Sequence, residues 1–184
     1  SSSIKELIGE LTTNLSIDPI IDDRMFVATW YKNNQLSQQY TNNAEAYFDC
    51  RNPFSDYWYR FLFIDGSNAT CQNEKMKKEL LEKHTYYRWQ QWSSLYGISK
   101  YSLVYLTNYE VPDYLIEYFQ TIYARMAELV LVQRASMLRF SGEITKVSQL
   151  SKQDVEAVSK RVSSLYKEYI RFVNQIYFRE ITAQ

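Results

Sequence analysis

The residue types that usually carry chemistry are few and scattered in this chain. His84 is the only histidine, and Cys50 and Cys71 are the only cysteines. Structural and catalytic zinc sites need three or four such ligands in close spacing, so we expect no zinc site. His84 falls on a partly apolar face of a predicted helix, which favours a structural histidine over a catalytic base. The two cysteines lack paired spacing, and we expect both thiols to be free.

Phosphate-binding loops and cation-binding acids are equally hard to find. Phosphate loops need clustered glycines, and the four glycines of this chain stand apart from one another. Asp22, Asp23 and Asp65 could offer oxygens to a hard cation, but acids in such positions are more often caps or solvated charges. We therefore predict no catalytic and no cofactor-binding residue, the metal ligands are unknown, and the chain is not expected to be an enzyme.

The charges balance, which bears on the class of partner. Lys plus Arg number 21 and Asp plus Glu number 21, so no net positive field attracts a phosphate backbone, and we expect no binding to nucleic acid. Arg125, Arg134 and Arg139 lie along one predicted helix. Helical spacing pairs Arg125 with Glu128 and Arg139 with Glu143. This face is interpreted as locally paired or solvated, with recognition of an acidic partner as the alternative.

The composition predicts long elements and aromatic surfaces. Only 4 glycines and 3 prolines occur in 184 residues, so tight turns are scarce. Tyr is used 17 times, with Phe 9 and Trp 4. Such amphipathic rings suit surfaces that are buried on one side and wet on the other. They indicate either interfaces or a tyrosine-rich core edge, and the sequence leaves both open.

Hydrophobic periodicity and turn residues place the elements of the first 110 residues. The pattern predicts helices over 4–15 and 74–96, and strands over 25–31, near 36–40, over 59–64 and over 100–107. Residues 32–35 are predicted as a turn and 41–57 as a loop with a short helix. Asn73 is the expected N-cap of the long helix, and Gly97 is the expected glycine beyond its end.

The order of these elements predicts the fold class. Strand 59–64, helix 74–96 and strand 100–107 form a strand-helix-strand crossover, whose two strands are parallel. Two long helices follow, one over 112–140 that Ser141-Gly142 could bend, and one from about residue 152 to the chain end. We expect an α/β (α+β) fold with a small mixed sheet. Residues 1–184 form one predicted domain, with a sheet-containing part over 1–110 and a helical pair over 111–184.

The final helix carries two apolar stripes, and this surplus is the main functional clue. A helix on the surface of a monomer needs only one apolar face. The predicted interface comprises Leu165, Tyr166, Tyr169, Ile170, Phe172, Val173, Ile176, Tyr177 and Ile181. Two explanations stay open. The preceding helix and the sheet could cover both stripes within one copy, or the second stripe could meet another subunit or a downstream segment of a longer protein.

The two chain ends indicate a fragment. The chain starts with three serines and no methionine, and its last helix reaches Gln184 without a stop signal, so we expect a piece of a longer protein. No apolar run approaches the roughly 18 to 20 residues that a membrane span needs.

Two stretches resemble a known family. Residues Ser99–Thr107 with Thr121–Ser141 form one, and Tyr169–Gln184 form the other. Together they resemble the cytoplasmic region of large bacterial membrane proteins distantly related to CorA-type magnesium transporters. The resemblance implies an N-terminal α/β domain that precedes a long stalk helix and two membrane spans, assembled as a pentameric funnel. The pore signature Gly-Met-Asn and both spans are absent from this chain, so the fragment itself is not expected to transport an ion.

This resemblance and the two stripes lead to one functional expectation. We expect a cytoplasmic assembly or regulatory domain of a CorA-like divalent metal ion transport protein, on the cytoplasmic side of the bacterial inner membrane. The fragment would hold no cofactor, while the full-length protein would use Mg²⁺ or another divalent cation. The expected partner is the chain itself, as a pentamer in the full-length protein, with membrane contact only through missing C-terminal segments. The alternatives are a soluble protein–protein interaction module and, third, an uncharacterised enzyme.

Overall fold

The structure is a computed structural model that describes residues 25–43, 47–149 and 155–177. The chain divides into two compact units. One spans Arg24–Leu131 and is named the sheet domain; the described residues from Val132 onward belong to the other. The predicted helix over 4–15 lies outside the described residues, and the single domain of residues 1–184 stays a prediction.

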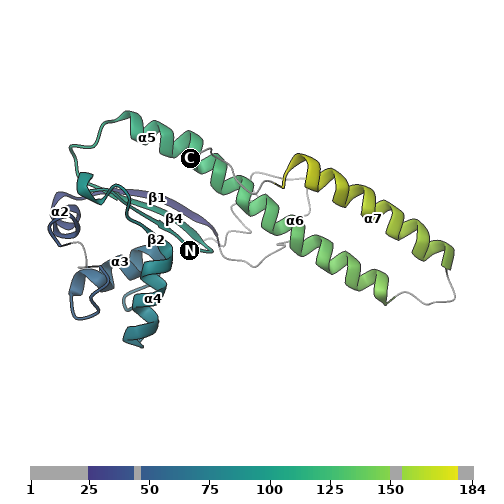
Figure 1. Cartoon of the computed structure of the whole chain (residues 1–184), viewed down its shortest axis with the longest axis horizontal. Helices are drawn as coiled ribbons and strands as arrows, with labels where there is room; N and C mark the ends of the chain where they lie inside the picture. The colour runs from purple at the N-terminus through teal and green to yellow at the C-terminus, as the bar shows by residue number, and fades with distance from the viewer. Residues whose placement is uncertain (1–24, 44–46, 150–154, 178–184) are drawn as a thin grey trace, which may run out of the picture. The chain divides into compact units, whose positions relative to one another are not determined.

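The sheet domain combines a four-stranded mixed sheet with short helices (Figure 1). Its elements are β1 (Val27–Lys32), α2 (Asn34–Asn42), α3 (Pro53–Phe63), α4 (Glu74–His84), β2 (Thr85–Tyr86), the 3-10 turn η1 (Gln90–Trp92), β3 (Leu95–Ile98), β4 (Ser102–Thr107), α5 (Tyr114–Tyr118) and the π-helical turn η2 (Phe119–Tyr123). The strand order is β1-β4-β3-β2; β1 runs parallel to β4, and the other pairs are antiparallel. Two long helices follow, α6 (Ala124–Ser148) and α7 (Val155–Gln175). The predicted α+β class is therefore confirmed.

The centre of the sheet is buried on both faces, because helices lie on each side of it (Figure 1). All six residues of β4 are buried, as expected for a central strand with a core on either side. Val104 and Leu106 pack in a core with α2, α3 and α4. Leu103 and Tyr105 point to the opposite face and pack with Phe119 of η2. The period-2 alternation of a strand thus supplies two separate cores from one segment.

The strand predicted near residues 36–40 is wrong, since this segment is helix α2. The side chain of Asn33 accepts a hydrogen bond from the Leu36 N–H at 2.9 Å, and this caps the helix. The residues predicted as a turn into a second strand therefore start a helix. Tyr40 is the main buried side chain of α2, and its hydroxyl donates to the Phe54 carbonyl at 2.7 Å.

The strand predicted over residues 59–64 is also wrong, because it is the second half of helix α3. The helix begins upstream, where Asn52 caps it and Pro53 takes the first turn. Its buried positions Ser55, Trp58, Tyr59 and Leu62 follow helical spacing. Ile64 ends the helix in the left-handed region, with φ of 54°. Aromatic residues normally favour strands, but here the N-terminal cap and the buried face override that preference.

The long helix predicted over residues 74–96 is correct at its start and wrong at its end. Asn73 caps α4 as predicted, accepting from the Met76 N–H at 2.9 Å. The helix ends at His84, and β2, η1 and β3 follow. Gly97 therefore lies in β3 and is no helix terminator. The parallel pair is β1 with β4, so the crossover begins at β1 and not at residues 59–64.

The helix predicted over 112–140 is observed as α5, η2 and α6 in succession, and α6 continues to Ser148. Gly142 does not interrupt it. The predicted pair of Arg125 and Glu128 is confirmed at 2.6 Å. Of the described residues, no helix is both long and apolar enough to cross a bilayer.

Candidate functional site

The described residues of the sheet domain form a pocket lined mainly by aromatic side chains. Its volume is about 780 Å³, within the usual range for a small-molecule site. The pocket lies where the carboxyl end of β4 meets α5, on the sheet face that carries Tyr105 and Phe119. Open α/β sheets commonly bind ligands beyond the carboxyl ends of their strands. We name it the aromatic pocket, after the seven Trp and Tyr residues that line it.

The floor of the aromatic pocket is a stacked pair of tyrosines. Tyr96 of β3 and Tyr105 of β4 are cross-strand partners, and their rings lie parallel with centroids 3.9 Å apart. Tyr123 of η2 packs against the Tyr96 ring at 5.7 Å. Burial raises the pKa of the Tyr96 phenol well above its usual range, with a further contribution from Tyr105. The floor therefore presents closely packed aromatic rings that are rich in π-electron density.

The wall from the β2–β3 connection is fixed by a strained backbone position. Ser93 has φ of 53°, in the left-handed region that residues with a Cβ rarely occupy. Its hydroxyl lies 2.8 Å from the hydroxyl of Thr41 on α2, which also donates to the Gln90 carbonyl at 3.2 Å. These bonds hold the loop so that Trp89 and Trp92 border the pocket. Trp92 is 73% exposed, which is unusual for the largest side chain.

The opposite wall comes from α5 and the π-helical turn η2. Tyr114 and Tyr118 lie one turn apart on α5 and contact each other edge to face, with centroids 5.5 Å apart. In η2, Phe119 is buried against Trp30 at 6.0 Å, while Tyr123 faces the pocket floor. Single π-helical turns inside helices are rare and often occur at functional sites. This one changes the direction of the helix face at the edge of the pocket.

Glu110 is the only charged residue among the described residues that line the aromatic pocket. It lies in the loop after β4, and its backbone N–H donates to the Asn108 side chain at 3.2 Å. The remaining polar lining is uncharged and comprises Gln91, Ser93, Ser94 and Asn108. No histidine, cysteine, lysine or arginine is among the described residues that line the pocket. Its polar and aromatic groups can bind and orient a ligand.

Sequence analysis missed the aromatic pocket. Residues 74–96 were predicted as one helix, which would have placed Trp89 and Trp92 on a helix and not in a connection beside β3. The available signal was the abundance of tyrosine and tryptophan around residues 86–123. That abundance indicates amphipathic surfaces in general. It cannot show that the segment before β3 and the segment after β4 line the same pocket.

The predicted interface residues lie in a second site, the helical hairpin formed by α7 and the part of α6 from Val132 onward. The two helices run antiparallel. Gln133 donates to the Ile176 carbonyl at 2.7 Å, Arg139 pairs with Glu168 at 3.2 Å, and Arg161 pairs with Glu143. The predicted pair of Arg139 and Glu143 is wrong, because each residue has a partner on α7.

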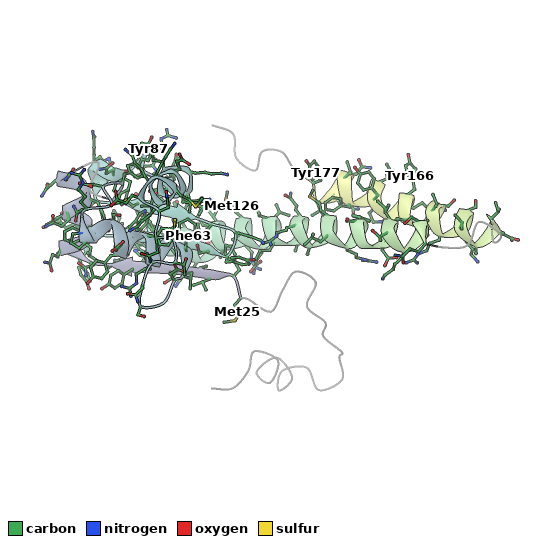
Figure 2. The ribbon with its side chains drawn as sticks, turned by 90° about the horizontal axis from the view of Figure 1, so that it is seen from below. Met25, Phe63, Tyr87, Met126, Tyr166 and Tyr177 are labelled. Atoms are coloured by element: carbon green, nitrogen blue, oxygen red, sulfur yellow. The ribbon has the colours of Figure 1, made fainter. Side chains whose placement is uncertain are left out.

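Only part of the predicted interface is used within the helical hairpin. Phe172 is buried, and with Tyr169 it packs against Phe140 of α6 at 5.4 and 5.6 Å. Leu165 and Ile176 are half-buried. We name Tyr166, Ile170, Val173 and Tyr177 the outer stripe. Its members Tyr166, Ile170 and Tyr177 are 64%, 39% and 43% exposed, and Val173 is half-buried. Figure 2 shows Tyr166 and Tyr177 along the outer edge of this segment. Ile181 lies outside the described residues.

The hairpin contains one carboxylate with two cationic partners, and this gives a pH prediction. Glu143 accepts hydrogen bonds from Lys146 and Arg161, and these lower the pKa of its carboxyl below the ordinary range. Because the folded-state pKa is lowered, this stabilisation is present above the unfolded-state pKa and is lost as pH falls through the folded-state value. We expect carboxyl ¹³C NMR to show a low titration midpoint for Glu143.

Substitutions of the two cationic partners test which of them lowers the Glu143 pKa. Lys146→Met and Arg161→Met should each raise the Glu143 midpoint, whereas Lys160→Met, beside Arg161 on α7, should leave it unchanged. An unchanged midpoint in Arg161→Met would contradict the pairing of the two helices at this level.

The other candidate residues have structural partners. The Nδ1 atom of His84 lies 2.7 Å from the Ile98 carbonyl, and its ring packs edge-on against Phe63. Asp65 accepts from both the N–H and the hydroxyl of Thr70 at 2.8 Å, which makes it a loop-stabilising residue. Cys50 and Cys71 are free thiols, as predicted. Asp22 and Asp23 lie outside the described residues. Within the described ranges, no group of three or more His, Cys, Asp or Glu could hold a metal ion.

Comparison with known proteins adds no relative. No family of known proteins, no curated protein and no solved structure matches this chain. The functional argument therefore depends on the aromatic pocket and the helical hairpin themselves.

Proposed function

We propose that this chain is an assembly domain that self-associates when the outer stripe of one helical hairpin packs against a second copy. One observation carries the proposal. Of the described residues in α6 and α7, which span 25 and 21 residues, only Phe172 is buried. Two long helices with one buried side chain between them have too small a core to hold their geometry unaided.

The face that the described residues leave uncovered is large enough for a stable interface. A 21-residue helix is about 31 Å long, and two helices side by side are about 20 Å across. Pairing one such face with another would bury roughly 1,200 Å² in total, the lower limit for specific complexes. The apolar side chains of the outer stripe would lie at its centre. Tyrosines there suit an interface because their rings add area and their hydroxyls find hydrogen-bond partners.

A second copy is the occupant that completes a standard architecture. Two antiparallel hairpins form a four-helix bundle, in which apolar stripes meet around a common core. Such a contact can be isologous, with the same outer stripe used by both copies. This supports the sequence-based expectation of a homo-oligomer.

The test is sedimentation velocity of the full chain between about 1 and 100 µM, a range in which a specific interface of this size is measurable. We expect the sedimentation coefficient to rise with concentration. Tyr166→Glu and Ile170→Glu should each weaken self-association at least about tenfold, because each places a charge in the centre of the contact. Ser164→Glu is the matched control. It adds the same charge on the same turn, about 200° around the helix axis from Tyr166, and should associate like the unsubstituted chain.

Two outcomes would overturn the proposal. One is a monomer at every concentration, which would leave the outer stripe to another partner or to a segment of the same chain. The other is equal loss of association in Ser164→Glu and Tyr166→Glu. Far-UV circular dichroism checks that each variant keeps its helices.

The wider hypothesis is that this assembly domain regulates a CorA-like divalent cation transporter at the cytoplasmic side of a bacterial membrane. It is supported by the resemblance of residues 99–107, 121–141 and 169–184, and it requires a contact between copies other than the isologous pair, because an isologous contact closes at two copies. Sedimentation equilibrium discriminates it from the alternative of an independent interaction module. Five copies per particle favour the CorA-like funnel, and two copies favour the interaction module.

A further inference from the structure

We infer that the aromatic pocket is a binding site for a small organic cation with an alkylated ammonium head group. This inference is independent of self-association, because every lining residue belongs to the sheet domain.

The first argument is electrostatic. The faces of Trp and Tyr rings carry partial negative charge, and alkylated ammonium groups bind in cages of such rings. The aromatic pocket presents these rings from three directions: Trp89 and Trp92, the stacked floor, and the tyrosines of α5 and η2. Glu110 adds the only formal charge of the described lining, and it is negative. The potential inside therefore favours a cation and disfavours an anion.

The second argument is that Trp89 already holds a cation of this chain. The guanidinium of Arg88 lies 5.1 Å from the Trp89 ring centroid. Arg88 is not itself a lining residue, so its charge does not occupy the described site. The contact shows that the Trp89 ring is placed to interact with a cation.

The third argument is preorganisation. The left-handed Ser93 and the π-helical turn η2 are both unfavourable local conformations, and they lie on opposite walls of the same pocket. Strained backbone persists only where the surrounding structure determines it, and it concentrates at binding sites. A pocket whose walls are fixed before binding loses less entropy when the ligand enters.

The charge of the described lining also decides against an anionic ligand. A nucleotide or other phosphate compound would meet Glu110 with no cation to offset its charge. A neutral ligand with an apolar or sugar-like surface would stack on the same rings equally well, however. The test must therefore separate the charge of the ligand from its shape.

The experiment compares choline with 3,3-dimethyl-1-butanol, which has the same shape but a carbon in place of the charged nitrogen. Two-dimensional ¹H–¹⁵N NMR of the full chain follows the four indole N–H signals. We expect choline to shift the signals of Trp89 and Trp92 and not that of Trp58, whose N–H donates to buried Thr85 at 2.8 Å. The neutral analogue should bind at least about tenfold more weakly.

Two variants separate the charge from the rings. Glu110→Gln should weaken choline binding about fivefold and leave the binding of the neutral analogue unchanged. Trp92→Ala should weaken both ligands, and its exposed position leaves the fold intact. Glu117→Gln is the control, because Glu117 is an exposed acid on α5 outside the pocket lining.

Either of two results would overturn the inference. Equal affinity for choline and the neutral analogue would show an apolar pocket without cation selectivity. No shift of the Trp89 and Trp92 signals up to about 50 mM choline, a concentration far above ordinary ligand affinities, would show that the pocket is no cation site.

Discussion

Replacing Gly97 by alanine is expected to destabilise the sheet domain by about 3 kcal/mol, because the added methyl group has no room. A Cβ at this position would lie 2.1 Å from Cδ1 of Leu62 and 2.6 Å from Cγ2 of Val104. Both neighbours are fully buried. They cannot move without disturbing the core between α3 and the sheet. Gly97 is therefore required for the close approach of α3 to β3.

Urea denaturation followed by tryptophan fluorescence measures this loss directly, since all four tryptophans lie in the sheet domain. Gly142→Ala is the matched control, with the same change of one methyl group. Gly142 lies within α6 with no neighbour inside 4 Å of an added Cβ. There alanine should stabilise the helix by about 1 kcal/mol, visible by circular dichroism at 222 nm. A Gly97→Ala variant as stable as the original chain would contradict the close approach described here.

The helices and strands that the sequence predicted correctly have local signals. The predicted strand 100–107 is rich in apolar, aromatic and β-branched residues, and β4 occupies Ser102–Thr107 within it. Asn73 caps α4 through a bond to a residue three positions away. The two long C-terminal helices follow from apolar spacing over more than twenty residues. Each of these signals lies within a single helix or strand, so it can be detected from the sequence.

The wrong elements are those in which tertiary packing outweighs local preference. Residues 59–64 are aromatic and apolar, and taken alone they resemble a strand. They continue helix α3, which begins upstream at the cap residue Asn52 and Pro53. Beyond His84, apolar residues keep a helical spacing up to Leu95. The pairing of β2 and β3 takes precedence there, with Tyr86 and Tyr96 as cross-strand partners. Strand pairing joins residues far apart in sequence, and periodicity does not report it.

The two candidate sites differ in the same way, because one follows from spacing within a helix and the other from tertiary packing. The apolar stripes of α7 belong to a single helix, so their spacing was visible from residues 155–177. The aromatic pocket joins the loop after β2, the floor of β3 and β4, and helix α5. Its formation depends on the left-handed Ser93 and on the π-helical turn, which no sequence motif indicates. Composition could indicate many tyrosines, but only the fold brings them together.

The largest electrostatic effect in the sheet domain is expected at the ion pair of Lys77 and Asp56. The Lys77 side chain is only 7% exposed, whereas that of Asp56 is 56% exposed. The ammonium also lies 5.7 Å from the ring centroid of Tyr59. Asp56→Asn removes the counter-charge and leaves the buried ammonium without an anion. We expect a loss of about 2 to 3 kcal/mol in the free energy of unfolding.

Removing both charges should lower the free energy of unfolding much less than Asp56→Asn alone does. Lys77→Met keeps a long apolar side chain in the buried position, so the double variant Asp56→Asn/Lys77→Met should regain at least about 1 kcal/mol relative to Asp56→Asn alone. The exposed pair of Lys78 and Glu82 on the same helix is the control, and Lys78→Met should cost at most about 0.5 kcal/mol. Urea denaturation of the unsubstituted chain, Asp56→Asn, Lys77→Met and the double variant closes the cycle. A buried charge that depends on its partner must show coupling when both are removed. Additive losses of unfolding free energy would therefore contradict the prediction. They would mean that the aromatic and apolar surroundings stabilise Lys77, and that Asp56 does not.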